Sequence, residues 1–67
     1  SRDKVLALCF AMHLSFTEVQ NLLKATGYPI LYARIERDSA IIFSLQRNCA
    51  LSDVNDLLYE LGYKELA

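Results

Sequence analysis

The sequence reads LSFTEVQNLLKATGY over residues 14–28 and CALSDVNDLLYELGY over residues 49–63, so one apolar pattern ends twice in the same Gly-Tyr pair. The likeness continues on both sides, because residues 2–31 align with residues 37–66 without a gap, at a spacing of 35. Most matched positions are apolar, and each glycine stands where a left-handed residue commonly ends a helix. The repeated feature is therefore a unit of packing and capping rather than a reactive site.

Each copy of the repeat predicts two helices. In the first copy, residues 3–13 are apolar almost all round, which is typical of a helix at the centre of a domain or beneath a partner. Ser15 and Glu18 have the spacing of a capping box, which begins the next helix. Gly27 ends that helix, and Pro29 disfavours helical backbone in the residue before it.

The second copy repeats this plan with one change at a helix start. We expect its first helix to begin at residue 34 or 36 and to end at residue 48, and its second to span residues 52–61. Ala50 occupies the position of the capping Ser15, so we expect Ser52 to take over the cap, two residues later. The residues expected to form the buried stripes are Phe16, Val19, Leu22, Leu23, Ile41, Ile42, Phe43, Leu45, Leu51, Val54, Leu57, Leu58 and Leu61.

The predicted fold is all-α: a compact helical bundle of two tandem hairpins, related by a rough twofold axis and packed face to face. Four helices are clear, and short turns at residues 29–33 and 64–67 would raise their number to five or six. An apolar fraction of 54% supplies the dense core that a 67-residue chain needs to fold as one domain. Because the chain begins with Ser1, we expect residues 1–67 to be a single interaction domain cut from a longer protein.

The sequence predicts neither a catalytic site nor a metal site. The single histidine, His13, has no nucleophile or carboxylate at a spacing that forms a charge relay. One histidine without a C-x-x-C pair leaves too few ligands for zinc. Cys9 and Cys49 lie in apolar runs, and we expect both to be buried, reduced thiols in a cytoplasmic protein. These features predict a protein that is not an enzyme and uses no cofactor or small-molecule substrate.

Charge and hydropathy narrow the classes of partner. The net charge of −1 gives no general attraction to nucleic acid or to anionic lipid. The longest apolar run, Val5–Met12, is too short to span a membrane. We therefore expect a protein partner and neither nucleic acid nor membrane.

The charges also divide the chain into regions of different sign. Residues 1–23 are balanced, residues 24–49 carry four basic against two acidic residues (+2), and residues 50–67 carry one basic against four acidic (−3). A domain with a basic and an acidic region can stack head to tail on its own copies; an ordinary mixed surface is the alternative. Arg37 shares an Arg-Asp motif with Arg2, so both could instead brace the helices internally. The candidate interface residues are Lys24, Arg34, Arg37, Arg47, Asp53, Asp56 and Glu60.

Four segments that span the chain resemble a small helical module of bacterial proteins. They are Arg2–Leu8, Leu14–Gly27, Leu31–Phe43 and Asn55–Gly62. Such modules are associated with two settings. One is the CARD-like, death-fold domain of bacterial anti-phage defence proteins, including proteases encoded beside bacterial gasdermins. The other is a segment that follows a helix-turn-helix domain in repressor-like regulators.

The first resemblance implies homotypic association, with itself or with another CARD-like domain, that brings effector proteases together and triggers cell death on infection. Death-fold domains have six helices. The chain would reach that number only if the short turns at residues 29–33 and 64–67 were both helical. The second resemblance implies a helical dimerisation or sensing segment of a transcriptional regulator. No segment of the chain has the basic recognition helix expected of a DNA reader. We therefore favour the recruitment module of a defence protein and keep the regulator segment as the alternative.

Overall fold

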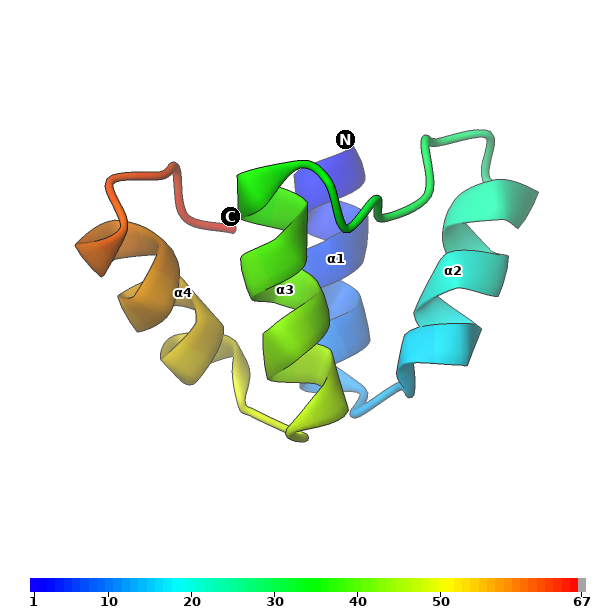
Figure 1. The fold of residues 1–67 in the computed structure, drawn as a ribbon. Helices are drawn as coiled ribbons and strands as arrows, with labels where there is room; N and C mark the ends of the chain where they lie inside the picture. The colour runs from blue at the N-terminus through cyan, green and yellow to red at the C-terminus, as the bar shows by residue number, and fades with distance from the viewer. Residues whose placement is uncertain (67) are drawn as a thin grey trace.

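The protein folds into four α-helices in a computed structural model that describes residues 1–66. Helix α1 spans Arg2–Ala11, α2 spans Phe16–Ala25, α3 spans Glu36–Gln46 and α4 spans Leu51–Glu60. Helices α1 and α3 occupy the centre, with α2 on one side and α4 on the other (Figure 1). The described residues contain no strand. The predicted all-α bundle of two helical hairpins is confirmed.

Local sequence determines both ends of α2. The Ser15 hydroxyl accepts a hydrogen bond from the Glu18 N–H at 3.2 Å, and the Glu18 carboxylate accepts one from the Ser15 N–H at 2.8 Å. This confirms the predicted capping box. At the other end Gly27 has a φ of +80°, and the Tyr28 N–H donates to the carbonyl of Leu23. The glycine therefore ends the helix as expected.

The start of α4 corrects the sequence prediction. Ser52 does not cap this helix; α4 begins at Leu51, and Ala50 is the N-cap residue. The Asp53 carboxylate accepts a hydrogen bond from the Ala50 N–H at 3.1 Å, although alanine offers no hydroxyl in return. The Asp53 half of the capping box is thus enough to begin α4 at the position equivalent to the start of α2. The Ser52 hydroxyl is not needed as a cap.

The two central helices end earlier than predicted. His13 and Asn48 lie 35 positions apart and have φ values of +56° and +55°, which no helix can continue through. Helix α1 therefore ends at Ala11 rather than at residue 13, and α3 ends at Gln46 rather than at residue 48. The segments at residues 29–33 and 64–66 form no helix, and residue 67 of the second predicted turn lies outside the described residues. Within the described part of the chain the bundle thus has four helices and not six.

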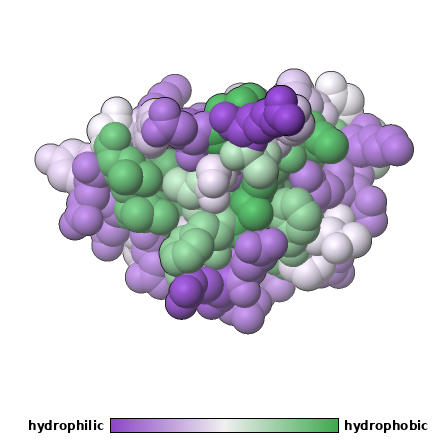
Figure 2. Space-filling model, in the orientation of Figure 1, coloured by the Kyte–Doolittle hydropathy of each residue, from purple (hydrophilic) through white to green (hydrophobic). Residues whose placement is uncertain are grey.

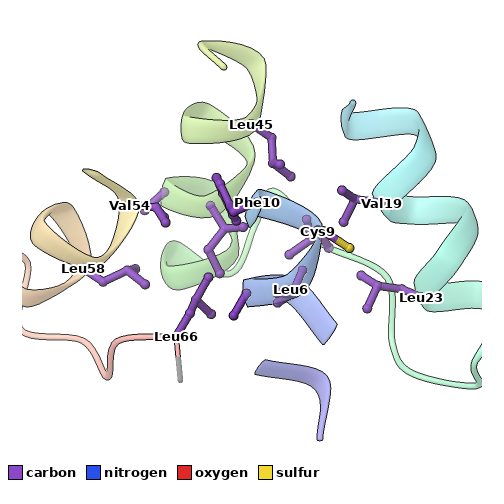
Figure 3. Packing of buried hydrophobic residues seen from close by; sticks show 13 residues of the cluster. Leu6, Cys9, Phe10, Val19, Leu23, Leu45, Val54, Leu58 and Leu66 are labelled. Atoms are coloured by element: carbon purple, nitrogen blue, oxygen red, sulfur yellow. The ribbon is translucent and has the colours of Figure 1, made fainter. Parts of the chain in front are cut away.

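The core consists of matching side chains from the two copies of the repeat. Buried residues 35 positions apart are paired as Leu6 with Ile41, Phe10 with Leu45, Val19 with Val54, Leu23 with Leu58, and Leu31 with Leu66. Labelled members of these pairs point into the space between the four helices (Figure 3). A rough twofold axis therefore relates α1 to α3 and α2 to α4, as the repeat predicted.

Two residues predicted to be buried lie largely on the surface. Phe43 is 49% exposed and Leu61 is 53% exposed. Leu61 comes directly after the last residue of α4, and about half of the Phe43 side chain on α3 is left uncovered by the other helices. Of the remaining predicted residues, Phe16, Leu22, Ile42, Leu51 and Leu57 are partly buried against the core. Apolar spacing identified the helices but not which flank of α3 meets the core.

Candidate functional site

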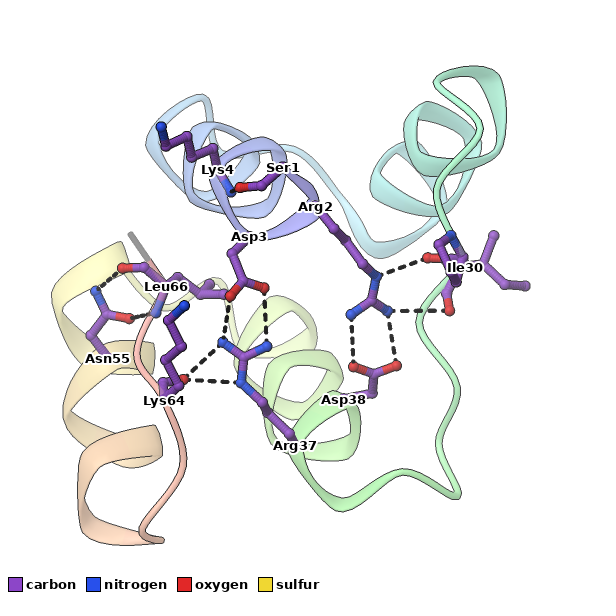
Figure 4. Close-up of polar contacts among 11 residues, drawn as sticks. Ser1, Arg2, Asp3, Lys4, Ile30, Arg37, Asp38, Asn55, Lys64 and Leu66 are labelled. Atoms are coloured by element: carbon purple, nitrogen blue, oxygen red, sulfur yellow. Dashed lines mark hydrogen bonds and ion pairs between the residues drawn. The ribbon is translucent and has the colours of Figure 1, made fainter.

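Two reciprocal ion pairs join the N-terminal ends of α1 and α3 (Figure 4). The Arg2 guanidinium donates to the two carboxylate oxygens of Asp38 at 3.1 and 2.9 Å. The Arg37 guanidinium donates to those of Asp3 at 3.0 and 3.1 Å. The two Arg-Asp motifs of the repeat are therefore exchanged across the twofold axis. Bidentate pairs of this kind are the stronger class of charge-assisted hydrogen bonds.

Each arginine also holds the segment that follows the outer helix of its own half. Arg2 donates to the carbonyls of Pro29 and Ile30 at 2.9 and 3.3 Å. Arg37 donates twice to the carbonyl of Lys64, at 3.0 and 2.8 Å. Arg37, a candidate interface residue, is thus engaged within the domain, in the bracing role that the shared Arg-Asp motif had suggested as the alternative.

A second matching pair of polar contacts was missed from the sequence. The Gln20 side-chain amide donates to the carbonyl of Leu31 and accepts from its N–H, at 2.8 and 2.7 Å. Asn55 does the same with Leu66, at 3.0 and 2.7 Å. These contacts tie the segments that follow α2 and α4 back onto those helices. The signal that could have revealed them is two amide side chains at equivalent positions of the repeat.

Contacts of this kind pair the buried polar side chains of the domain. No buried side-chain nitrogen or oxygen lacks a hydrogen-bond partner among the residues that the structure describes. Within residues 1–66, no three potential metal ligands lie close enough to hold an ion. None of the helices in that range has the length and apolar character needed to cross a bilayer.

The thiols and the histidine lie apart from one another. Cys9 is buried, and burial raises the pKa of its thiol. Its repeat mate is Ser44, whose buried hydroxyl donates to the carbonyl of Ala40 at 3.0 Å. Cys49 is half-buried, which corrects the expectation that both thiols are fully enclosed, and His13 is exposed. Cys9 thus fills a core position that a small polar side chain fills in the other half.

The other six candidate interface residues are all exposed, on several different elements. Three acidic ones share α4, whereas the basic ones are spread over α2, the connection before α3 and the turn after it. Arg47 lies over the ring of Phe43, with its guanidinium carbon 4.6 Å from the ring centre. The six residues are Lys24, Arg34, Arg47, Asp53, Asp56 and Glu60. The structure therefore gathers the acidic candidates on one helix but not the basic ones.

A groove of about 450 Å³ runs between α3 and α4. In Figure 2 apolar side chains gather over this face of the molecule, with hydrophilic side chains at its edges. The pKa of Tyr63 is raised, chiefly by the neighbouring Glu36 carboxylate, which favours the protonated phenol. The residues that line the groove are Ala33, Arg34, Glu36, Ser39, Ala40, Phe43, Leu57, Leu61 and Tyr63. The groove is thus apolar in its floor and walls and charged at its rim.

No family model, curated protein or solved structure matches this chain.

The ion pair of Asp3 predicts a loss of stability in acid. The pKa of Asp3 is lowered below its usual 3.8, chiefly by hydrogen bonds from Arg37. A carboxyl group whose pKa is lowered by folding stabilises the protein above its unfolded pKa, and that stability is lost as the pH falls through the folded value. We expect the melting temperature to fall as the pH drops from about 5 to about 2.5. Thermal melts followed by circular dichroism measure this.

The variant Asp3→Asn serves as the control for that acid-induced loss. It lacks the titrating carboxyl group, so its melting temperature should be lower than that of the parent at neutral pH. The same temperature should fall by less than that of the parent on acidification. Equal losses in the two proteins over the same pH range would show that the Asp3 pair contributes nothing to acid sensitivity.

Proposed function

We propose that this domain is a protein–protein interaction module that associates with copies of itself. The observation that carries the proposal is the exposure of large apolar side chains at two places, along α1 and in the groove between α3 and α4. Leu8 and Met12 on the α1 side expose 55% and 58% of their surface, and Phe43 and Leu61 in the groove expose about half. Apolar patches rimmed by polar residues are typical of protein contact sites.

The distribution of charge supports self-association. We leave the four residues of the two internal ion pairs out of the count. Residues 1–35 then carry three basic residues and one acidic residue, a net charge of +2. Residues 36–66 keep two basic against five acidic, a net charge of −3. The pseudo-twofold axis thus relates a basic half to an acidic half. Oppositely charged surfaces steer association and disfavour contact between like halves.

The setting of this association is a further part of the proposal. The sequence resemblance to CARD-like modules supports recruitment of effector proteins in bacterial defence, in the cytoplasm, with a second such domain as partner. The domain would then supply no chemistry of its own and would act by raising the local concentration of the protein to which it is joined.

Light scattering coupled to size-exclusion chromatography tests the proposal. We expect the mean mass of the 67-residue chain to rise above one copy between about 10 μM and about 1 mM, the range of weak homotypic contacts. Raising the salt concentration should weaken association without abolishing it, because screening acts on the charges and not on the apolar contacts. A mass of one copy at every concentration would contradict the proposed function.

A further inference from the structure

We infer that association is heterologous, with a ridge on α1 of one copy seated in the α3–α4 groove of the next. The α1 ridge consists of Lys4, Leu8 and Met12. This inference rests on the proposed function and specifies which two surfaces of the domain meet.

The α1 ridge has the shape of a row that can enter a groove. Its three residues follow one another at intervals of four, from Lys4 and Leu8 on α1 to the C-cap residue Met12, whose backbone is still in the helical region, so their side chains lie in line along one face. All three are exposed, whereas Leu6 and Phe10 turn the opposite face of α1 into the core. The fold itself therefore leaves the apolar part of this ridge without a partner.

The α3–α4 groove offers matching walls. Phe43 and Leu61 are half exposed along it, and Leu57 lies deeper. Side chains in a row on one helix pack well into the depression between two others. The apolar contents of ridge and groove are thus complementary.

Charge selects the ridge over a second groove as the occupant. The groove rim carries Arg34 and Glu36, and Arg47 lies over the ring of Phe43, but the adjoining α4 exposes three carboxylates, those of Asp53, Asp56 and Glu60. The ridge brings a positive charge from Lys4, which this acidic surface attracts. Groove against groove would place the acidic α4 helices of two copies together, and like charges across an interface are costly.

The symmetry of the fold places the two surfaces on opposite faces. Leu8 and Phe43 occupy equivalent positions of the repeat, so the twofold axis relates the ridge to one wall of the groove. In Figure 1 α3 lies in front of α1. One copy can therefore offer its ridge and its groove at the same time. A contact between two different surfaces does not close on two copies and builds an open chain.

Two complementary variants test this arrangement. Leu8→Glu places a charge on the ridge, and Phe43→Glu places one in the groove; either change should weaken self-association about tenfold or more. When the two variants are mixed in equal amounts, one intact contact is possible. The unaltered ridge of the Phe43→Glu variant can enter the unaltered groove of the Leu8→Glu variant. We expect light scattering to show pairs in the mixture and single copies in each variant alone. Tyr59→Glu is the matched control: Tyr59 is 73% exposed on α4 and does not line the groove, so this variant should associate like the parent.

The outcomes separate this inference from the proposed function. If the parent associates but the mixture forms no pairs, the contact uses other surfaces and the inference is wrong, while the module still binds itself. If the parent stays a single copy at all concentrations, both are wrong. Circular dichroism establishes that each variant is folded; if a glutamate variant is not, Leu8→Gln and Phe43→Gln decide by the same mixing experiment.

Discussion

Replacing Arg2 with Met is expected to lower the free energy of unfolding by about 3–5 kcal/mol. The Asp38 side chain is only 4% exposed, and Arg2 supplies both hydrogen bonds of its ion pair. Methionine keeps much of the aliphatic packing of arginine but leaves this carboxylate buried, with the Tyr32 N–H at 3.0 Å as its remaining partner. A domain of this size has a total stability of about 3–10 kcal/mol, so the variant should lose a large share of it. Urea denaturation followed by circular dichroism measures the loss.

The repeat provides an internal control for this prediction. Arg37→Met removes the equivalent arginine, but its partner Asp3 is 22% exposed and can recover hydration. We expect the free energy of unfolding of this variant to fall by a smaller amount, about 1–3 kcal/mol. Adding Asp38→Asn to Arg2→Met should restore part of the stability, since it removes the unpaired charge. Equal losses for the two arginine variants would contradict an explanation based on the burial of Asp38.

The bracing role of Arg37 also affects how the interface is tested. Reversal of its charge would break a contact inside the domain and would confuse folding with association. Asp56 is exposed on α4, so its reversal changes the surface charge without removing an internal ion pair. Asp56→Arg is therefore the cleaner charge-reversal variant of the two.

Leu23→Ala and Leu58→Ala should each lower the free energy of unfolding by about 2–5 kcal/mol, by similar amounts. Both leucines are 0% exposed, and they occupy equivalent positions against the two central helices. Each truncation leaves a cavity that the surrounding side chains fill only in part. Urea denaturation of both variants checks the size of the loss and its equality.

The matched comparison for these truncations is Leu8→Ala. Leu8 is a leucine on a helix like the other two, but it is more than half exposed. Its truncation should change stability by no more than about 0.5 kcal/mol. If one of the buried leucines behaved like Leu8, the two halves would not share a core in the way the repeat requires.

The repeat, the four helices and most of their ends follow from the sequence alone, because they depend on interactions between residues close together in the chain. The capping box at Ser15 and Glu18 spans one helical turn, and Gly27 ends α2 through its own backbone conformation. The same local reasoning was wrong where a non-glycine residue adopted a positive φ, as at His13 and Asn48. It was also wrong at Ala50, where half a capping box was sufficient.

Tertiary structure alone decided which surfaces are covered and which charges are free. Arg2 and Asp38 are 36 positions apart, so their pairing depends on how α1 and α3 meet and not on any local preference. The same docking turned Arg37 inward while leaving Phe43 exposed beside α4. Periodicity shows that a helix has an apolar side, but the width and direction of its contact depend on the shape of its neighbours. For that reason the sequence predicted the bundle, whereas the groove and the ridge are visible only once the two halves are packed together.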